Sequence, residues 1–136
     1  KWVSLIALSG MGDDKPEELV LTSMSRARFC ELIAPRIGMK DRSSDLFLTG
    51  MFSMIDAFID QPMEEILNDL PLSEAIKTAL LGGENVYRTA LETAISYEKG
   101  DWDSLVILKK RLGLGEEEFP HIFQSSIQWA SRIFTA

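Results

Sequence analysis

The chain has 136 residues, a formal net charge of −7 from 14 Lys and Arg against 21 Asp and Glu, and 46% hydrophobic residues. This acidic balance, with no basic run longer than residues 109–111, argues against a nucleic-acid partner, because such binding gains most of its affinity by neutralising phosphates. No apolar stretch approaches the ~20 residues that cross a bilayer, so no membrane span is expected. The single cysteine excludes an internal disulfide. The composition therefore predicts one globular domain over residues 1–136.

Helical spacing of apolar residues runs through nearly the whole sequence, and no segment alternates apolar and polar residues for long. The first expected helix covers residues 2–9. The second covers residues 16–37, with Pro35 bending or shortening its end and Gly38 terminating it. The third is expected to continue without interruption over residues 43–60.

Further short helices follow the same pattern. One begins after Pro62, one covers residues 74–81 after the capping residue Ser73, and Asn85 and Asp101 cap the next two. The last helix begins after three consecutive glutamates, and its residues spaced for burial are Phe119, Phe123, Ile127, Ala130 and Phe134. About eight helices joined by short turns predict an all-α, compact multi-helix bundle.

One acidic residue stands on the apolar side of the second helix. At about 100° per residue, Glu31 projects beside Val20, Met24 and Ala27. Because an unpaired buried carboxylate is costly, we expect Arg28, three residues earlier, to pair with it. A structural ion pair is the leading interpretation, and a ligand-contacting or catalytic pair is the alternative.

The third expected helix is the most apolar stretch of the chain, and we expect it to be buried on nearly every side. Its polar residues form one narrow stripe, interpreted as a thin strip of solvent contact. They are Asp45, Thr49, Ser53, Asp56 and Asp60. The alternative is a polar patch, with Ser53 and Asp56 contacting a partner or a cation. Gly50 lies elsewhere on this helix, where a glycine is best explained by the close approach of another backbone.

Catalytic signatures are missing from the sequence. His121 is the only histidine and Cys30 the only cysteine, so the ligands of a standard transition-metal site are not present. No nucleophile elbow and no glycine-rich phosphate loop occurs. Cys30 lies on the apolar face of its helix and is expected to be an inert core thiol. We therefore expect no catalytic residues, no metal ligands and no cofactor.

Several segments together resemble one bacterial family. Residues 26–34 (RARFCELIA) resemble the RAxxCExLA segment of HDOD domains, which are modified relatives of HD and HD-GYP phosphohydrolases. Residues 45–56 (DLFLTGMFSMID) are similar to that family's (D)xLFxxGLFSxLD segment. Residues 63–72, 76–81 and 98–102 continue the resemblance. These motifs are helix-packing patterns rather than catalytic signatures.

The resemblance implies the C-terminal portion of an HDOD domain in a two-domain protein that also contains an EAL domain. It implies a cytoplasmic, non-catalytic regulatory or interaction domain in bacterial signal transduction, linked to cyclic di-GMP through the EAL domain. The expected partner is a protein or that attached domain, and a homodimer is possible. The candidate contact residues are Arg28, Glu31, Ser53 and Asp56. A degenerate metal-dependent phosphohydrolase and a purely structural dimerisation module remain the alternatives.

Overall fold

The computed structural model describes residues 17–114 and 119–135, and within them the protein is built from helices and turns without a strand. The α-helices are α2 (Glu17–Ile33), α3 (Ser43–Met51), α4 (Ile55–Ile59), α5 (Met63–Asn68), α6 (Glu74–Leu80), α7 (Val86–Lys99), α8 (Trp102–Leu112) and α9 (Phe119–Thr135). Short 3₁₀ helices cover Ala34–Ile37, Lys40–Arg42 and Phe52–Met54. The all-α bundle predicted from the sequence is confirmed. The helix expected over residues 2–9 lies outside the described residues.

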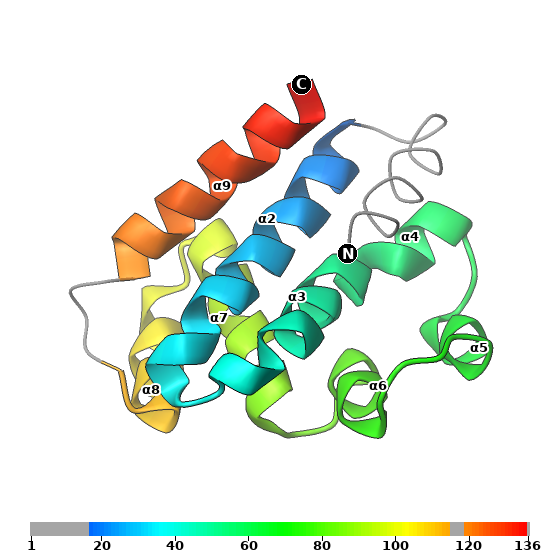
Figure 1. Ribbon diagram of the computed structural model, residues 1–136, viewed down its shortest axis with the longest axis horizontal. Coiled ribbons are helices and arrows are strands. Elements are labelled where there is room, and N and C mark those ends of the chain that lie inside the picture. The colour runs from blue at the N-terminus through cyan, green and yellow to red at the C-terminus, as the bar shows by residue number, and fades with distance from the viewer. Residues whose placement is uncertain (1–16, 115–118, 136) are drawn as a thin grey trace.

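Helix α2 lies at the centre of the bundle, with α3, α7 and α9 packed around it (Figure 1). Helix α9 runs alongside α2 in the opposite direction. Small residues let these neighbours approach closely, and Ser23, Ser25 and Ala27 are all buried. Ser25 is buried although it is polar, because α2 is enclosed on more than one face.

The uninterrupted helix expected over residues 43–60 is wrong. Helix α3 ends at Met51, a 3₁₀ turn follows, and α4 ends before Asp60, which has a left-handed φ of 59°. The Ser53 hydroxyl donates a hydrogen bond to the Gly50 carbonyl at 2.7 Å. Such a bond from a serine to a carbonyl of the preceding turn, next to a glycine of low helix propensity, favours a tightened turn at this point.

This broken segment is also less enclosed than expected. Leu46, Phe47 and Met51 are buried, but Phe52 is half-buried and Ile59 is exposed. The polar stripe is not a continuous strip of solvent contact either, because Thr49 is fully buried. Its hydroxyl donates to the Asp45 carbonyl at 2.9 Å, which satisfies the buried group. Only Asp56 and Asp60 at the far end of the stripe are exposed.

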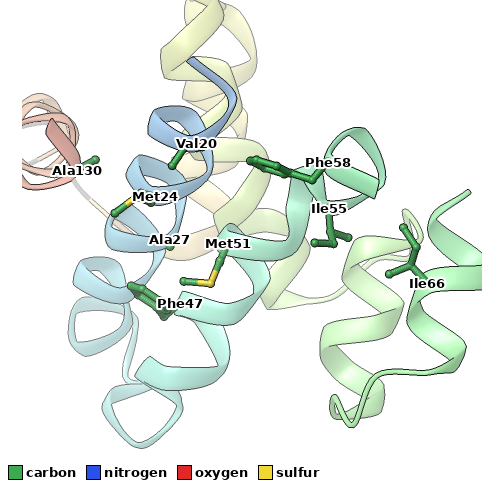
Figure 2. Packing of buried hydrophobic residues seen from close by; sticks show 9 residues of the cluster. All are labelled: Val20, Met24, Ala27, Phe47, Met51, Ile55, Phe58, Ile66 and Ala130. Atoms are coloured by element: carbon green, nitrogen blue, oxygen red, sulfur yellow. The ribbon is translucent and has the colours of Figure 1, made fainter. Parts of the chain in front are cut away.

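The close backbone approach expected at Gly50 is confirmed. A Cβ atom at this position would lie 2.5 Å from the carbonyl carbon and oxygen of Arg26 and 2.6 Å from the nitrogen of Ala27. Helices α2 and α3 therefore cross here with their backbones in contact. The apolar cluster around this crossing draws residues from five helices (Figure 2); its buried members are Val20, Met24, Ala27, Phe47, Met51, Ile55, Phe58, Ile66 and Ala130.

The helix starts in the second half of the chain agree with the sequence. The side chains of Ser73, Asn85 and Asp101 accept hydrogen bonds from backbone N–H groups in the first turns of α6, α7 and α8. Helices α7 and α8 form a hairpin joined by Gly100, which has a φ of 68°. Among the described helices, none combines the length and apolar character needed to cross a bilayer.

The face that α9 buries differs only in part from the one expected, because Ala130 is buried as predicted. Ile122, Ser126 and Ala130, four residues apart, face α2, whereas Ile127 is exposed and Phe123 is half-buried. The i, i+4 row wins because α9 lies almost along α2, so one ridge of the helix stays in contact over its length. The side chains of the other two residues expected on this face lie outside the described residues.

Candidate functional site

The ion pair predicted within α2 is present. The Arg28 Nη1 atom lies 2.7 Å from the Glu31 Oε1 atom, and the two side chains are 32% and 15% exposed. The Arg28 guanidinium also lies 5.3 Å from the ring centre of Trp129 on α9, within the range of a cation–π contact. The pair therefore borders the α2–α9 seam, at the edge of the core rather than inside it.

The other two predicted contact residues, Ser53 and Asp56, lie on the segment after α3. Ser53 accepts a hydrogen bond from Arg26 Nη1 at 3.2 Å, whereas Asp56 is exposed at the start of α4. Arg26 and Arg28 are two residues apart on α2, so their side chains leave the helix in different directions. The four predicted residues consequently do not share one site.

The best-organised polar contact of the described residues surrounds Arg26 instead. Its Nε and Nη2 atoms donate to the two carboxylate oxygens of Glu98, each at 2.8 Å, while Nη1 donates to Ser53. The two charged side chains are 13% and 24% exposed. We call these three residues the Arg26 junction. It connects α2, the 3₁₀ turn after α3 and the end of α7 through a bidentate pair, which fixes geometry better than a single contact.

Sequence reasoning did not identify the Arg26 junction. Both charged residues lie inside motifs that carry the HDOD resemblance, Arg26 at the start of residues 26–34 and Glu98 at the start of residues 98–102. Those motif positions were the available signal. The pairing itself spans 72 residues. Helical periodicity reports only which residues share a face of one helix, so it does not identify partners this far apart.

Cys30 lies one turn further along α2 and is fully buried. Burial raises the pKa of the Cys30 thiol to about 12, the positive charge of Arg26 lowers this pKa in part, and Glu98 raises it. A thiol with such a pKa remains protonated near neutral pH and is a poor nucleophile. These properties agree with the core role expected for Cys30.

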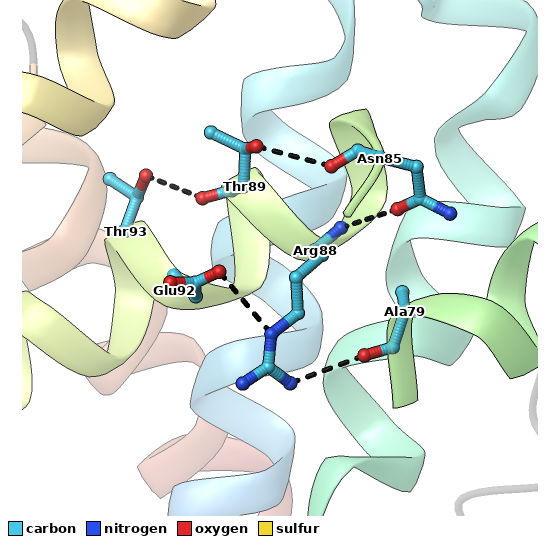
Figure 3. A network of polar contacts seen from close by, with 6 residues as sticks. All are labelled: Ala79, Asn85, Arg88, Thr89, Glu92 and Thr93. Atoms are coloured by element: carbon cyan, nitrogen blue, oxygen red, sulfur yellow. Dashed lines mark hydrogen bonds and ion pairs between the residues drawn. The ribbon is translucent and has the colours of Figure 1, made fainter. Parts of the chain in front are cut away.

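A second polar network connects α6 with α7 (Figure 3). Arg88 Nη1 donates to the Ala79 carbonyl at 3.2 Å, and Arg88 Nε donates to Glu92 at 3.3 Å. Asn85 caps α7 by accepting from the Arg88 backbone N–H at 2.8 Å, and its Nδ2 donates to the Ala75 carbonyl at 2.9 Å. The network therefore holds the start of α7 against α6.

A further polar contact joins α7 to α3. The Tyr87 hydroxyl donates to Asp45 Oδ2 at 3.2 Å. Burial and, after it, the negative charge of Asp45 raise the pKa of Tyr87, so the phenol stays protonated and acts as the donor. Like the Arg26 junction, this contact stabilises the packing of helices.

Hollows open on the surface of the described part of the chain. A groove of about 440 Å³ follows the α7–α8 seam and has mixed walls; its lining residues are Arg88, Glu92, Ile95, Ser96, Lys99, Asp101, Ser104, Ile107, Leu108 and Arg111. A smaller hollow of about 270 Å³ has mostly apolar walls between α2 and α9 and includes Phe123 and Ile127. Within the described residues, no three His, Cys, Asp or Glu side chains gather closely enough to hold a metal ion.

Comparison with known proteins finds relatives that align with almost the whole chain. The cyclic di-GMP phosphodiesterase CdgJ of Vibrio cholerae is 33% identical over 132 residues, which cover 97% of this chain and 31% of the relative. The uncharacterized protein YuxH of Bacillus subtilis is 30% identical over 139 residues, which cover 100% of this chain and 33% of the relative. The chain thus spans about a third of the length of these curated relatives. No family model and no solved structure matches it.

Proposed function

We propose that this chain is a non-catalytic regulatory domain of the HDOD type, which acts in bacterial cyclic di-GMP signalling through contacts with an EAL phosphodiesterase domain. One observation carries the proposal: 97% of the chain aligns, at 33% identity, with one part of CdgJ, a protein named as a cyclic di-GMP phosphodiesterase. In this proposal the domain works in the cytoplasm and alters the activity of the attached enzyme without breaking bonds itself.

The positions of the motif residues support this proposal. Arg26, Ala27 and Gly50 meet where α2 and α3 cross, and Glu98 from the segment 98–102 pairs with Arg26. The motifs that resemble the HDOD family therefore specify how helices pack against one another. A domain whose distinctive residues fix packing is suited to presenting surfaces to another domain.

A chimera tests the proposal. The segment of CdgJ that aligns with this chain is replaced by residues 1–136, and cyclic di-GMP hydrolysis is measured for CdgJ, for CdgJ lacking the segment and for the chimera. We expect the truncated protein to show altered hydrolysis and the chimera to restore the level of CdgJ. A chimera with Arg26→Met, which loses the bidentate pair, should restore less. A chimera with Lys77→Met, a change in a short peripheral helix, serves as the matched control.

Two outcomes would contradict the proposal. Truncated CdgJ and the chimera hydrolysing cyclic di-GMP at the rate of intact CdgJ would show that the domain has no regulatory effect. Hydrolysis by the isolated chain with added Mg²⁺ or Mn²⁺, abolished by Asp56→Ala or Glu31→Gln, would establish the degenerate phosphohydrolase instead. The isolated chain is therefore assayed in parallel, with metal content measured after purification.

A further inference from the structure

The outward side of α8 is apolar although it faces solvent. Helix α8 packs mainly on α7 and buries Leu105 and Leu108 there. On its other side Trp102 is 61% exposed, Val106 is 45% exposed and Ile107 is 55% exposed. Three large apolar side chains on one helix of eleven residues form a concentrated patch, and such patches commonly mark interaction surfaces.

Charged residues of opposite sign lie near the two ends of this patch. Asp103 lies near the start of α8, and Lys110 and Arg111 lie near its end. None of the three has an ion-pair partner within residues 17–114 and 119–135. Asp103 and Lys110 are seven residues apart, which is two helical turns, so they lie on the same side of the helix. We call this surface the α8 outer face; it comprises Trp102, Asp103, Val106, Ile107, Lys110 and Arg111.

The order of residues on the α8 outer face is self-complementary. If a second α8 lies against the first in the opposite direction, with the twofold axis between Val106 and Ile107, each Asp103 faces the Lys110 of the other copy. The same register places Val106 against Ile107 of the other copy, so that apolar side chains meet at the centre of the contact. A symmetric interface requires that one patch complement itself in this way.

We propose that the α8 outer face binds the α8 outer face of a second copy of this chain in an antiparallel, twofold-symmetric contact. Charge complementarity selects this occupant, because a copy presents the opposite charge to Asp103 and to Lys110. It also presents an apolar side chain to Val106 and to Ile107. The groove along the α7–α8 seam adjoins the contact, and Ile107 and Arg111 belong to both. The inference stands independently of the role in cyclic di-GMP signalling.

The size of the contact sets the expected affinity. Two helices of eleven residues form an interface at the small end of specific complexes, and such interfaces bind weakly. We therefore expect a reversible dimer with a dissociation constant in the micromolar range. Sedimentation equilibrium of the 136-residue chain, from low micromolar to near-millimolar concentration, measures it directly.

Charge reversal tests the register. Asp103→Lys places two lysines together at both symmetric positions, and Lys110→Asp places two aspartates there, so each change should weaken the dimer by roughly tenfold or more. The double variant Asp103→Lys/Lys110→Asp restores opposite charges and should return the dissociation constant to within about threefold of the original, because reversing both charges leaves each pair attractive. Glu74→Lys on α6 is the matched control, and it should leave dimerisation unchanged because it lies outside the α8 outer face.

Circular dichroism and thermal melting of each variant distinguish loss of association from loss of folding. A variant that melts like the original but sediments as a monomer supports the proposal. If Asp103→Lys perturbs α8 itself, Val106→Asp provides an independent disruption at the centre of the contact. A chain that stays monomeric at every concentration, a dimer unaffected by these changes, or a double variant that fails to recover would each overturn the proposal.

Discussion

Gly50 packs directly against the main chain of a neighbouring helix. Its missing side chain lets the backbones of α2 and α3 touch, and the neighbouring atoms belong to the main chain of Arg26 and Ala27. Main-chain atoms inside a central helix do not move aside as a flexible side chain would. The structure therefore indicates that even alanine is too large at this position.

Gly50→Ala should lower the free energy of unfolding by about 3 kcal/mol or more, because its methyl group meets the α2 backbone. The control is Gly82→Ala. Gly82 has a φ of 94° and no atom within 4 Å of the added Cβ, so its substitution costs about 1 kcal/mol from backbone strain alone. Chemical denaturation monitored by circular dichroism measures both. Equal losses for the two variants would mean that α2 and α3 do not cross at Gly50.

The Cys30 thiol should not react with a thiol reagent such as Ellman's reagent at pH 8 while the protein is folded. Its pKa is raised to about 12, so the thiol stays protonated at pH 8. Its side chain is also buried, so the reagent does not reach the sulfur atom. Reaction should appear with the unfolding transition in denaturant and reach one thiol per chain. A rapid reaction in buffer would show that the thiol is accessible in the folded state.

These residues differ in how far the sequence could predict them. The pair of Arg28 and Glu31 was predictable because both lie on one helix three residues apart. The role of Gly50 was predictable because glycine inside a helix is unfavourable without a packing reason. The pairing of Arg26 with Glu98 was not predictable, since it depends on how α2 and α7 meet in space.

At the scale of elements, the ends of helices were predicted better than the interruption within one. Ser73, Asn85 and Asp101 cap their helices as expected, because a cap depends on a local hydrogen bond between neighbouring residues. The break between α3 and α4 was missed. Apolar periodicity continues through it, while the turn is set by the Ser53 hydroxyl and by contacts with α2.

The Arg26 junction should stabilise the position of α7 against α2. Arg26→Met should cost about 2–3 kcal/mol of unfolding free energy, because Glu98 loses both hydrogen bonds in a partly buried site. In a double-mutant cycle with Glu98→Gln, we expect a coupling energy of about 1–2 kcal/mol. Arg26→Lys should recover only part of the loss, since an ammonium group does not form the bidentate contact.

The pair of Arg88 and Glu92 is the matched control for this cycle. It lies within one helix at i, i+4 spacing and is more exposed, with N–O separation of 3.3 Å. Its coupling should be about 0.3–0.5 kcal/mol, the usual range for such pairs. A coupling between Arg26 and Glu98 no larger than that of the control would show that the junction adds nothing to the packing of α7.

At the scale of the whole molecule, the fold class was predictable and the arrangement was not. Helical periodicity and caps together indicated an all-α bundle. The sequence pointed to residues 43–60 as the most enclosed segment, because they are the most apolar. The structure places α2 at the centre instead, since its small residues permit close contact with three neighbouring helices. Which helix becomes central depends on shape as well as on hydrophobicity.

Native-state hydrogen exchange should rank the helices by their place in the bundle. Backbone amides of α2 are expected to exchange only on global unfolding, because α3, α7 and α9 cover this helix. Amides of α8, which packs mainly on α7, should exchange faster by way of local opening. Mass spectrometry of peptic fragments from the 136-residue chain resolves these segments. Faster exchange in α2 than in α8 would contradict the arrangement.

The side-by-side position of α2 and α9 has a consequence for synthesis on the ribosome. About 100 residues separate the start of α2 from the start of α9, so a nascent chain made at ~5–20 residues per second contains α2 for ~5–20 s before its last neighbour exists. During that interval Val20 and Met24 lack the cover of Ala130. Truncated messenger RNAs that end before α9 would yield chains in which the apolar face of α2 is exposed. Such chains are expected to be bound by chaperones and degraded by proteases.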